Sequence, residues 1–353
     1  MNNFSYTADG SNYSIAFNQS DYDDWDNYSD WSSDSSSPFG KEQLIFMVIY
    51  SLVLLLGVPG NTLVIWISGF RMKRSVNTTW FLNLAVADLL CCLSLPFLIS
   101  TLAMDYHWPF GNVACKVINA LIFLNMFCSI FLLTVISLDR LLLVSRPVWC
   151  QNWRTAAKAQ WVCLLVWVLA LLFCTPLFIY RVELHDPLAN KILCHSSYSD
   201  SEGVGFAVLR FLVGFLGPFV VIVMCHYVVY TKANQGRSKS HKTLRVICAV
   251  VLGFFVCWFP YHIVGFFLAL TPSNSPQMFY IRQADIFCLC LAYLNSCLNP
   301  LLYVCVGRSF KDSLRRSLKS VMVNFLSEDS HKASLSGPSM TTMTSDKPRE
   351  NLC

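Results

Sequence analysis

One carboxylate, Asp88, lies in the middle of an otherwise apolar stretch of the chain. An ionised carboxylate is costly to place among apolar groups, so Asp88 is a functional candidate by default. Short oxygen-bearing side chains around one carboxylate suit a small hard cation, most simply sodium. A polar network that only holds helices together is the alternative, and the sequence favours neither. The residues expected to form this cluster are Asp88, Asn125, Ser129, Asn295, Ser296 and Asn299.

Three further charges interrupt apolar stretches near their ends: Arg181, Arg210 and Asp285. Two cations and one anion facing the same space would suit the end of a peptide. The peptide carboxylate would bind the arginines, and a basic side chain would bind Asp285. The alternative is an internal Arg210–Asp285 pair that serves only the structure. No Ser–His pair, HExxH-like pattern or metal-ligand spacing of Cys and His is found, so we expect neither an enzyme nor a metal centre beyond the sodium site.

The elements that carry these residues are predicted to be membrane helices. Of the 353 residues, 55% are hydrophobic and 13% are charged, about half the charged fraction typical of a soluble domain. The apolar runs are long and continuous, which excludes the short alternating segments of a membrane barrel. We therefore predict an all-α bundle of seven transmembrane helices within residues 41–306, with spans near 44–70, 79–104, 117–138, 159–180, 206–231, 246–270 and 284–306.

Basic residues predict the orientation of the bundle. Since Lys and Arg concentrate on cytoplasmic loops, the N-terminus is expected outside the cell and the C-terminus inside, in a multi-pass plasma-membrane protein. No cleavable signal peptide is visible. The basic side carries Arg71, Lys73, Arg74, Arg146, Arg154, Lys158, Lys232, Arg237, Lys239, Lys242, Arg245, Arg308, Lys311, Arg315, Arg316 and Lys319.

The sixteen cysteines do not form a disulfide scaffold, because most of them fall within the apolar runs. With the predicted spans, only Cys115 and Cys194 lie on the oxidising side. They are therefore expected to form one disulfide between the start of the third span and the loop after the fourth.

Residues 1–40 contain seven Asp and no Lys or Arg, with Tyr and Trp between them. Such a segment cannot bury a core, so we expect a disordered extracellular tail. It is either a solvated tail or an electrostatic attractor for a basic partner, with Tyr22 and Tyr28 as sulfation sites. Glycosylation sequons begin at Asn3, Asn12, Asn18 and Asn27, whereas the sequon at Asn77 lies on the cytoplasmic side and is a false match.

Two prolines suggest moving parts. Pro260 lies beside Trp258 in the sixth span, and a proline within a helix frees a carbonyl and bends the axis, so this point is a plausible pivot. Asn299-Pro300, followed by Tyr303, repeats the pattern in the seventh span. After it, residues 307–320 predict an amphipathic helix on the lipid of the inner leaflet, and residues 321–353 a disordered cytoplasmic tail with phosphorylation sites.

The third span ends in Asp139-Arg140 at the cytoplasmic surface, and this pair completes a set of motifs in order along the chain. Together they resemble the rhodopsin-like (class A) G-protein-coupled receptors. The motifs are Asn61, Leu84-Ala85-Val86-Ala87-Asp88, Cys115, Asp139-Arg140, Trp167, Pro218, Cys257-Trp258-Phe259-Pro260 and Asn299-Pro300-Leu301-Leu302-Tyr303. Within that family the chain is similar to the chemoattractant group, the receptors for complement anaphylatoxins and for formyl peptides. This similarity rests on Trp108-Pro109-Phe110-Gly111 and Trp149-Cys150-Gln151-Asn152-Trp153-Arg154.

The acidic tail with Arg181, Arg210 and Asp285 most resembles the branch of the group that recognises the anaphylatoxin of complement component five. The resemblance implies that the tail captures a basic protein whose C-terminal segment enters the bundle. The sixth helix would then swing about Pro260, and Arg140 would contact a heterotrimeric G protein, usually of the inhibitory class, to drive leukocyte chemotaxis. The resemblance also implies arrestin as a partner.

Two departures from the family pattern lie near the coupling surface. Leu141 replaces the usual aromatic residue after Asp-Arg, and His226 stands where the family has a tyrosine. A non-signalling decoy for the same ligand class is therefore one alternative. A formyl-peptide-type receptor is the other. A transporter or channel is disfavoured because the chain has no internal repeat and only one deep acid besides Asp285.

Overall fold

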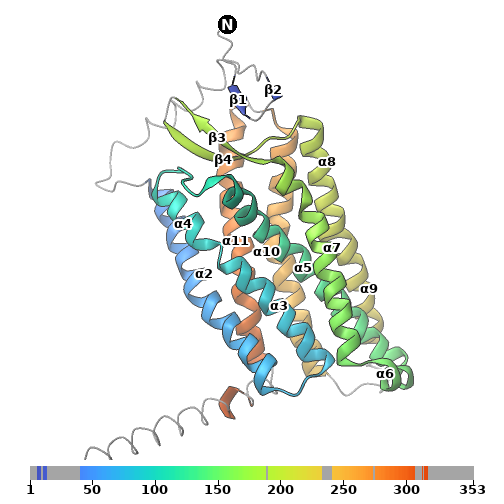
Figure 1. Ribbon diagram of the computed structural model, residues 1–353. Coiled ribbons are helices and arrows are strands. Elements are labelled where there is room, and N and C mark those ends of the chain that lie inside the picture. The colour runs from blue at the N-terminus through green and yellow to red at the C-terminus, as the bar shows by residue number, and fades with distance from the viewer. Residues whose placement is uncertain are drawn as a thin grey trace, which may run out of the picture.

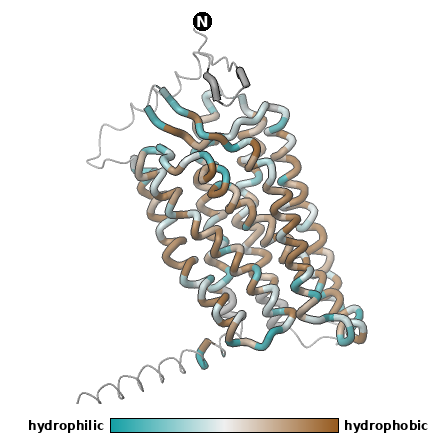
Figure 2. The backbone as a smooth tube through the Cα atoms, viewed as in Figure 1, coloured by the Kyte–Doolittle hydropathy of each residue, from teal (hydrophilic) through white to brown (hydrophobic). Residues whose placement is uncertain are grey.

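The computed structural model describes residues 6–8, 11–13, 40–187, 190–232, 241–272, 275–306, 312 and 314–316. Seven of its helical spans are long and apolar enough to cross a membrane, and they pack side by side into one bundle (Figure 1). Apolar residues dominate the middle of the spans, with hydrophilic residues toward the ends (Figure 2). The predicted seven-helix membrane bundle is confirmed.

Several spans consist of more than one helical segment. The first four are α2 (Lys41–Trp66) with the π-helical turn η2 (Ile67–Arg71), α3 (Val76–Cys92) with α4 (Leu95–Ala103), α5 (Gly111–Ser145), and α7 (Ala156–Tyr180) preceded by the short α6 (Pro147–Trp153). The other three are α8 (Asp200–Phe211) with the π-helical turn η3 (Leu212–Leu216) and α9 (Gly217–Lys232), then α10 (His241–Leu270), then α11 (Gln277–Val306).

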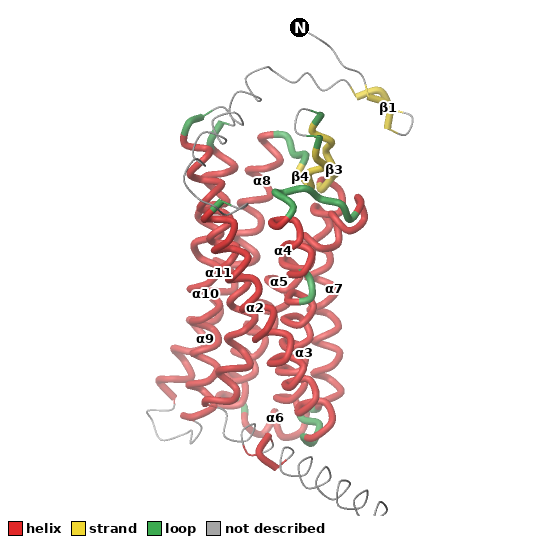
Figure 3. Tube along the Cα trace, turned by 90° about the vertical axis from the view of Figure 1, so that its left-hand side faces the viewer, coloured by secondary structure: helices red, strands yellow, loops and turns green. Residues whose placement is uncertain are grey.

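A β-hairpin covers one end of the bundle (Figure 3). Strands β3 (Arg181–Asp186) and β4 (Lys191–Ser196) pair antiparallel, with Glu183 opposite Cys194. We refer to this end as the hairpin end and to the opposite end as the α6 end. A second small hairpin, β1 (Tyr6–Ala8) with β2 (Ser11–Tyr13), falls in the acidic segment expected to be disordered. Most of that segment lies outside the described residues.

Helix starts follow the capping chemistry of the sequence. Ser75 Oγ accepts a hydrogen bond from the Thr78 amide (3.2 Å), and Thr78 Oγ1 accepts one from the Ser75 amide (2.8 Å), so α3 begins with a reciprocal cap. Thr155 Oγ1 accepts a hydrogen bond from the Lys158 amide and caps α7 by this single contact. The caps satisfy backbone donors that a helix leaves without partners in its first turn.

The second span was expected to be continuous, and the structure breaks it at Leu93-Ser94. Pro96 occupies the first turn of α4, where its missing amide hydrogen does no harm. Ser94 Oγ donates to the Cys91 carbonyl (2.6 Å) and lies 3.0 Å from the Tyr293 hydroxyl. The break therefore places the Ser94 side chain of the second span against Tyr293 of the seventh span.

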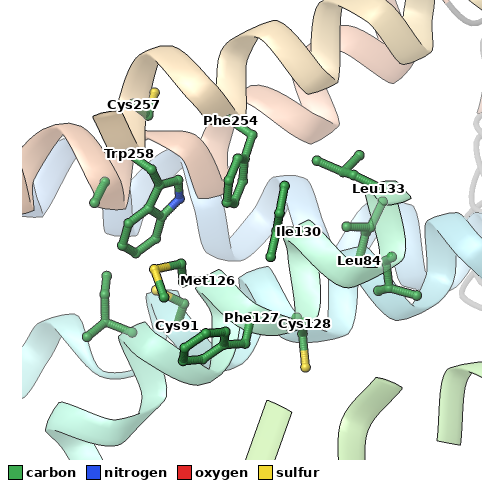
Figure 4. Close-up of a cluster of buried hydrophobic side chains, with 14 of the residues drawn as sticks. Leu84, Cys91, Met126, Phe127, Cys128, Ile130, Leu133, Phe254, Cys257 and Trp258 are labelled. Carbon is green, nitrogen blue, oxygen red and sulfur yellow. The ribbon is translucent and has the colours of Figure 1, made fainter. Parts of the chain in front are cut away.

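The third span is the most buried of the seven, so α5 lies at the centre of the bundle. Its apolar side chains pack against those of α3 and α10 in the principal core cluster. Figure 4 shows Met126 of α5 beside Trp258 of α10, with Phe254 and Ile130 next to them. A polar contact adds to this packing: Trp167 Nε1 of α7 donates to Asn83 Oδ1 of α3 (3.0 Å).

The predicted disulfide between Cys115 and Cys194 is confirmed, and it ties the start of α5 to strand β4. Twelve other cysteines have described side chains; all twelve are free thiols, and all but Cys248 are buried. Beside the disulfide, Trp108 is only 1% exposed, and its Nε1 donates to the Gly111 carbonyl (3.1 Å). The hairpin is thus anchored on a rigid aromatic corner of the bundle.

Candidate functional site

Arg210 lies near the end of α8, immediately before the π-helical turn η3. Since α8 begins at Asp200, Arg210 is almost three turns into the fifth span, whereas a span beginning near residue 206, as predicted, would place it about one turn in. π-Helical turns inside longer helices often mark functional positions, because they change the direction of the side chains next to them.

The guanidinium of Arg210 lies over two aromatic rings. Its Cζ is 4.9 Å from the ring centre of Tyr261 and 5.5 Å from that of Phe123. Gly265, one helical turn beyond Tyr261, leaves the space that the guanidinium fills, because a Cβ atom there would overlap Arg210 Nη2. Arg210 Nε is buried without a hydrogen-bond partner among the described residues. The side chain is therefore held in place with hydrogen-bonding capacity to spare.

Asp285 lies in α11, about two turns from its start at Gln277. Both Arg210 and Arg181 act on its carboxylate through Coulomb attraction. Within the described part of the chain, however, neither Arg210 nor Asp285 has an opposite charge within 4.0 Å. The three charges are thus near one another without the close internal pair that a purely structural role would require.

Arg181 directly follows α7 as the first residue of β3. Its Nη1 donates to the Cys194 carbonyl (3.2 Å), which fixes the side chain to the disulfide-bonded strand. Its Nε is buried and, like that of Arg210, has no hydrogen-bond partner in the described ranges. Two arginines with free donors and one unpaired carboxylate give the hairpin end the charges to bind both the carboxylate and the side chain of a C-terminal arginine.

Sequence reasoning missed several residues of this region. Tyr261 and Gly265 are spaced four residues apart on α10, and this spacing could have suggested a shared helix face next to Pro260. Glu183 Oε1 is buried and has no partner among the described residues, and the same holds for both ring nitrogens of His262. No pattern in the sequence indicated either side chain, because the lack of hydrogen-bond partners for their polar atoms arises from tertiary packing.

A separate ion pair lies at the edge of the hairpin end. Lys191 donates to Asp105 Oδ2, and Gln43 Nε2 donates to Asp105 Oδ1 (3.0 Å). The hydrogen bond from Lys191 is the main reason that the pKa of Asp105 is held below its usual value. Asp105 also has a positive φ of 50°, a conformation that Asp and Asn tolerate better than most residues.

Trp258 lies beneath this region, fully buried. Its ring centre is 5.8 Å from that of Tyr261 and 6.0 Å from that of Phe254 (Figure 4 shows Phe254 beside it). Pro260 lies within α10 two residues later. Tyr261 touches both Arg210 and Trp258, so it joins the charged region to the expected pivot.

The predicted polar cluster around Asp88 is assembled in the centre of the bundle. Asn299 Nδ2 donates to Asp88 Oδ2 (2.7 Å), Asn125 Nδ2 to Ser296 Oγ (3.0 Å), and Ser129 Oγ to Asn125 Oδ1 (3.2 Å). Asn295 is buried on α11 as well. Asp88 Oδ1 is buried with no hydrogen-bond partner among the described residues. A buried carboxylate oxygen without a partner, in a cluster that also contains serine and asparagine oxygens, fits a small hard cation.

At the α6 end, Asp139 is bound on both oxygens by Arg154. Arg154 Nε donates to Oδ1 (2.6 Å) and Nη2 to Oδ2 (2.9 Å), whereas Arg140 Nη2 lies 3.6 Å from Oδ2. Asn77 Oδ1 accepts hydrogen bonds from both Arg140 and Arg154 (2.7 Å for the latter). Asn77, noted in the sequence only as a false sequon, therefore joins α3 to the arginine expected to contact a G protein.

His226, one of the two departures from the family pattern, connects three helices. Its Nε2 is 3.1 Å from Ser137 Oγ of α5, and its Nδ1 is 3.2 Å from Cys248 Sγ of α10. Leu141, the other departure, is partly buried.

Several of the predicted site residues lie wholly or partly outside the described part of the chain. The backbone of Tyr303 continues α11, but its side chain is outside the described part, whereas Pro300 is described and buried in the same helix. Asn12 falls in β2, again without a described side chain. Tyr22, Tyr28, Asn3, Asn18 and Asn27 lie outside the described residues, as do most of residues 307–320 and all of 321–353.

Comparison with known proteins gives a consistent result. The family described as 7 transmembrane receptor (rhodopsin family) matches residues 60–303. A protein of Oncorhynchus mykiss named C5a anaphylatoxin chemotactic receptor 1 is 53% identical over 320 residues, covering 88% of this chain and 90% of that protein. A protein of the same name from Danio rerio is 48% identical, covering 90% of this chain and 95% of that protein. The one from Homo sapiens is 41% identical, covering 84% of this chain and 85% of that protein.

Proposed function

This chain belongs to the rhodopsin family of seven-transmembrane receptors, and we propose that it is a chemoattractant receptor for a basic anaphylatoxin of the C5a kind. The receptor is a multi-pass protein of the plasma membrane that has a peptide ligand and a G protein as partners, and it is not an enzyme. The hairpin end faces the outside of the cell in this proposal, and the α6 end faces the cytosol. The basic residues of the loops at the α6 end support this orientation.

The ligand's C-terminal segment enters the bundle at the hairpin end. Its carboxylate binds Arg181 and Arg210, and its terminal arginine binds Asp285. The observation that carries this assignment is the absence of a close partner for Arg210 and Asp285 within the described residues, although each lies near opposite charge. Charges held apart in this way leave both available to a ligand, whereas an internal pair would not.

The acidic tail increases the rate of capture. Its seven Asp and the sulfated Tyr22 and Tyr28 attract a basic protein over a distance of about one Debye length, and glycans occupy Asn3, Asn12, Asn18 and Asn27. The alternative role, a tail that only improves solubility, predicts that its removal leaves the association rate unchanged.

Signalling proceeds from the ligand to the cytosolic side through α10. A ligand that displaces Arg210 acts on Tyr261 and then on Trp258, and α10 swings about Pro260. Arg140 leaves Asn77 and contacts an inhibitory-class G protein, while Pro300 and Tyr303 adjust α11. In leukocytes the outcome is chemotaxis, and phosphorylation of residues 321–353 recruits arrestin.

The cluster around Asp88 would hold a sodium ion, which would stabilise the resting state. Asp88 would supply the negative charge, and Asn125, Ser129, Asn295, Ser296 and Asn299 would supply neutral oxygens or hydrogen bonds. The unpartnered Asp88 Oδ1 supports this assignment over a purely structural network. Bound sodium would balance the buried carboxylate and hold α3, α5 and α11 together.

One observation favours a decoy as the second candidate. The His226 contacts with Ser137 and Cys248 join α5, α9 and α10 close to the α6 end, and they must break before α10 can move. A receptor in which they persist would bind ligand without signalling.

An experiment in transfected cells distinguishes the signalling receptor from the decoy. Full-length receptor is exposed to C5a, to the other anaphylatoxins and to formyl peptides, with inhibition of cyclic AMP and ligand internalisation measured together. The receptor proposal predicts a response to C5a that Arg140→Ala abolishes while binding remains. Binding and internalisation with no response in either form would establish the decoy, and a response to formyl peptides alone would contradict the ligand assignment.

A further inference from the structure

Two tryptophans of α6 form an exposed aromatic pair that belongs neither to the proposed ligand site nor to the proposed pivot at Pro260. Trp149 and Trp153, one helical turn apart, stack with ring centres 6.4 Å apart and planes inclined by 7°. They remain 48% and 55% exposed. Large aromatic rings are normally covered in a folded protein, so a stacked and open pair indicates a surface with a partner.

A lysine completes this surface. Lys158 Nζ lies 4.0 Å from the ring centre of Trp153. Its neighbour Arg154 is occupied by Asp139, but Lys158 has no carboxylate within 4.0 Å among the described residues. Moreover, no acidic residue occurs between Arg140 and Val182. The charge of Lys158 is therefore available to an anion from outside the chain.

The surface continues into the membrane-facing side of α7. Lys158, Trp161, Leu165, Val168 and Leu172 follow one another at intervals of three and four residues, so they share one helix face. The four apolar members are exposed, Trp161 by 72%. In Figure 1, α6 lies at the lower end of α7, at the end of the bundle. The Trp149–Trp153 pair is thus placed at the border between the hydrocarbon layer and water.

We propose that Trp149, Trp153 and Lys158 form a binding site for the headgroup of an anionic phospholipid. The amphipathic indole rings suit the depth of the headgroups, and the lysine supplies the charge that selects an anionic lipid over a zwitterionic one. A lipid is favoured over a protein because the apolar face of α7 continues the site without interruption. That the lipid belongs to the cytoplasmic leaflet rests on the orientation proposed above.

Brominated lipids provide a direct test, since bromine quenches the fluorescence of tryptophans that it contacts. Full-length receptor is placed in nanodiscs that contain a fifth of either brominated phosphatidylserine or brominated phosphatidylcholine. Emission of a Trp149→Phe/Trp153→Phe variant is subtracted from that of the wild type, so the difference reports the pair alone. Both leaflets have the same composition, so an error in the proposed orientation does not alter the outcome.

The site predicts that quenching of the pair by the serine lipid is at least about twice that by the choline lipid. Lys158→Gln should reduce it to the choline level. Arg71→Gln is the matched control, because Arg71 also lies over a tryptophan, Trp66 (4.9 Å), and its loss should change nothing at the pair. Equal quenching by both lipids with and without Lys158 would overturn the proposal, and so would an absence of quenching, which would point to a protein partner.

Discussion

Asp139 receives two hydrogen bonds from Arg154, at 2.6 and 2.9 Å, while its sequence neighbour Arg140 stays 3.6 Å away. The acid of the Asp-Arg pair is therefore held mainly by the residue that follows α6. The side chains of Asp139 and Arg154 are largely buried, and charge-assisted pairs of this geometry are among the stronger polar contacts. The resting arrangement of the α6 end depends on a residue fifteen positions further along the chain.

The first prediction concerns this pair. Arg154→Ala should raise ligand-independent signalling about three- to tenfold, because it removes a contact of about 1 kcal/mol from the resting state only. Basal nucleotide exchange on a purified G protein measures the effect. Arg146→Ala, at an exposed arginine near the same end, is the control and should leave basal exchange unchanged.

The second prediction concerns the space that holds Arg210. Gly265→Ala keeps every charge but places a methyl group where the guanidinium lies, so ligand potency should fall at least about tenfold. Arg210→Ala should reduce it by about thirtyfold or more, since it removes a partner of the ligand carboxylate. Concentration–response curves and surface expression are measured in parallel. A loss of expression that accounts for the loss of potency would support a structural role for Arg210 instead.

Much of this architecture was predictable from the sequence, because membrane helices follow from the length and apolarity of a run. The disulfide was predictable because topology left two cysteines on one side. The break at Leu93-Ser94 was not predictable, since Ser94 lies against Tyr293 of another helix, and neither was the π-helical turn η3. Asn77 was dismissed for the same reason: its role appears only when Arg140 and Arg154 are seen to share its oxygen.

The third prediction tests the cation site. In the wild type, replacing potassium by about 150 mM sodium should weaken agonist binding, because sodium at Asp88 stabilises the resting state. Asp88→Asn should bind agonist equally in both salts, having lost the anionic oxygen that attracts the ion. Radioligand competition at constant ionic strength measures this. A wild-type receptor that binds agonist equally in both salts would leave the cluster with only a structural role.

The fourth prediction is a pH dependence at the hairpin end. The pKa of Asp105 is lowered in the folded state by Lys191, so the pair stabilises the fold fully above the ordinary pKa of about 4, and less as pH falls through the lowered value. Asp105→Asn should therefore lower the melting temperature slightly, by the same amount at pH 7 and pH 5. The difference should shrink below about pH 4. A difference that already changes between pH 7 and pH 5 would contradict this assignment.

The most direct test of the whole account pairs Asp285 with the terminal arginine of the ligand. Wild-type and Asp285→Asn receptors in nanodiscs are each activated by C5a and by C5a lacking its last arginine, and nucleotide exchange on an inhibitory-class G protein is measured. We predict that either change alone lowers potency at least about thirtyfold, and that both together cost little more than one, because they remove the same contact. If the double change lowered potency by the product of the two single effects, the proposed contact between Asp285 and the terminal arginine would be contradicted. Intact C5a that fails to activate the wild type would contradict the proposed receptor itself.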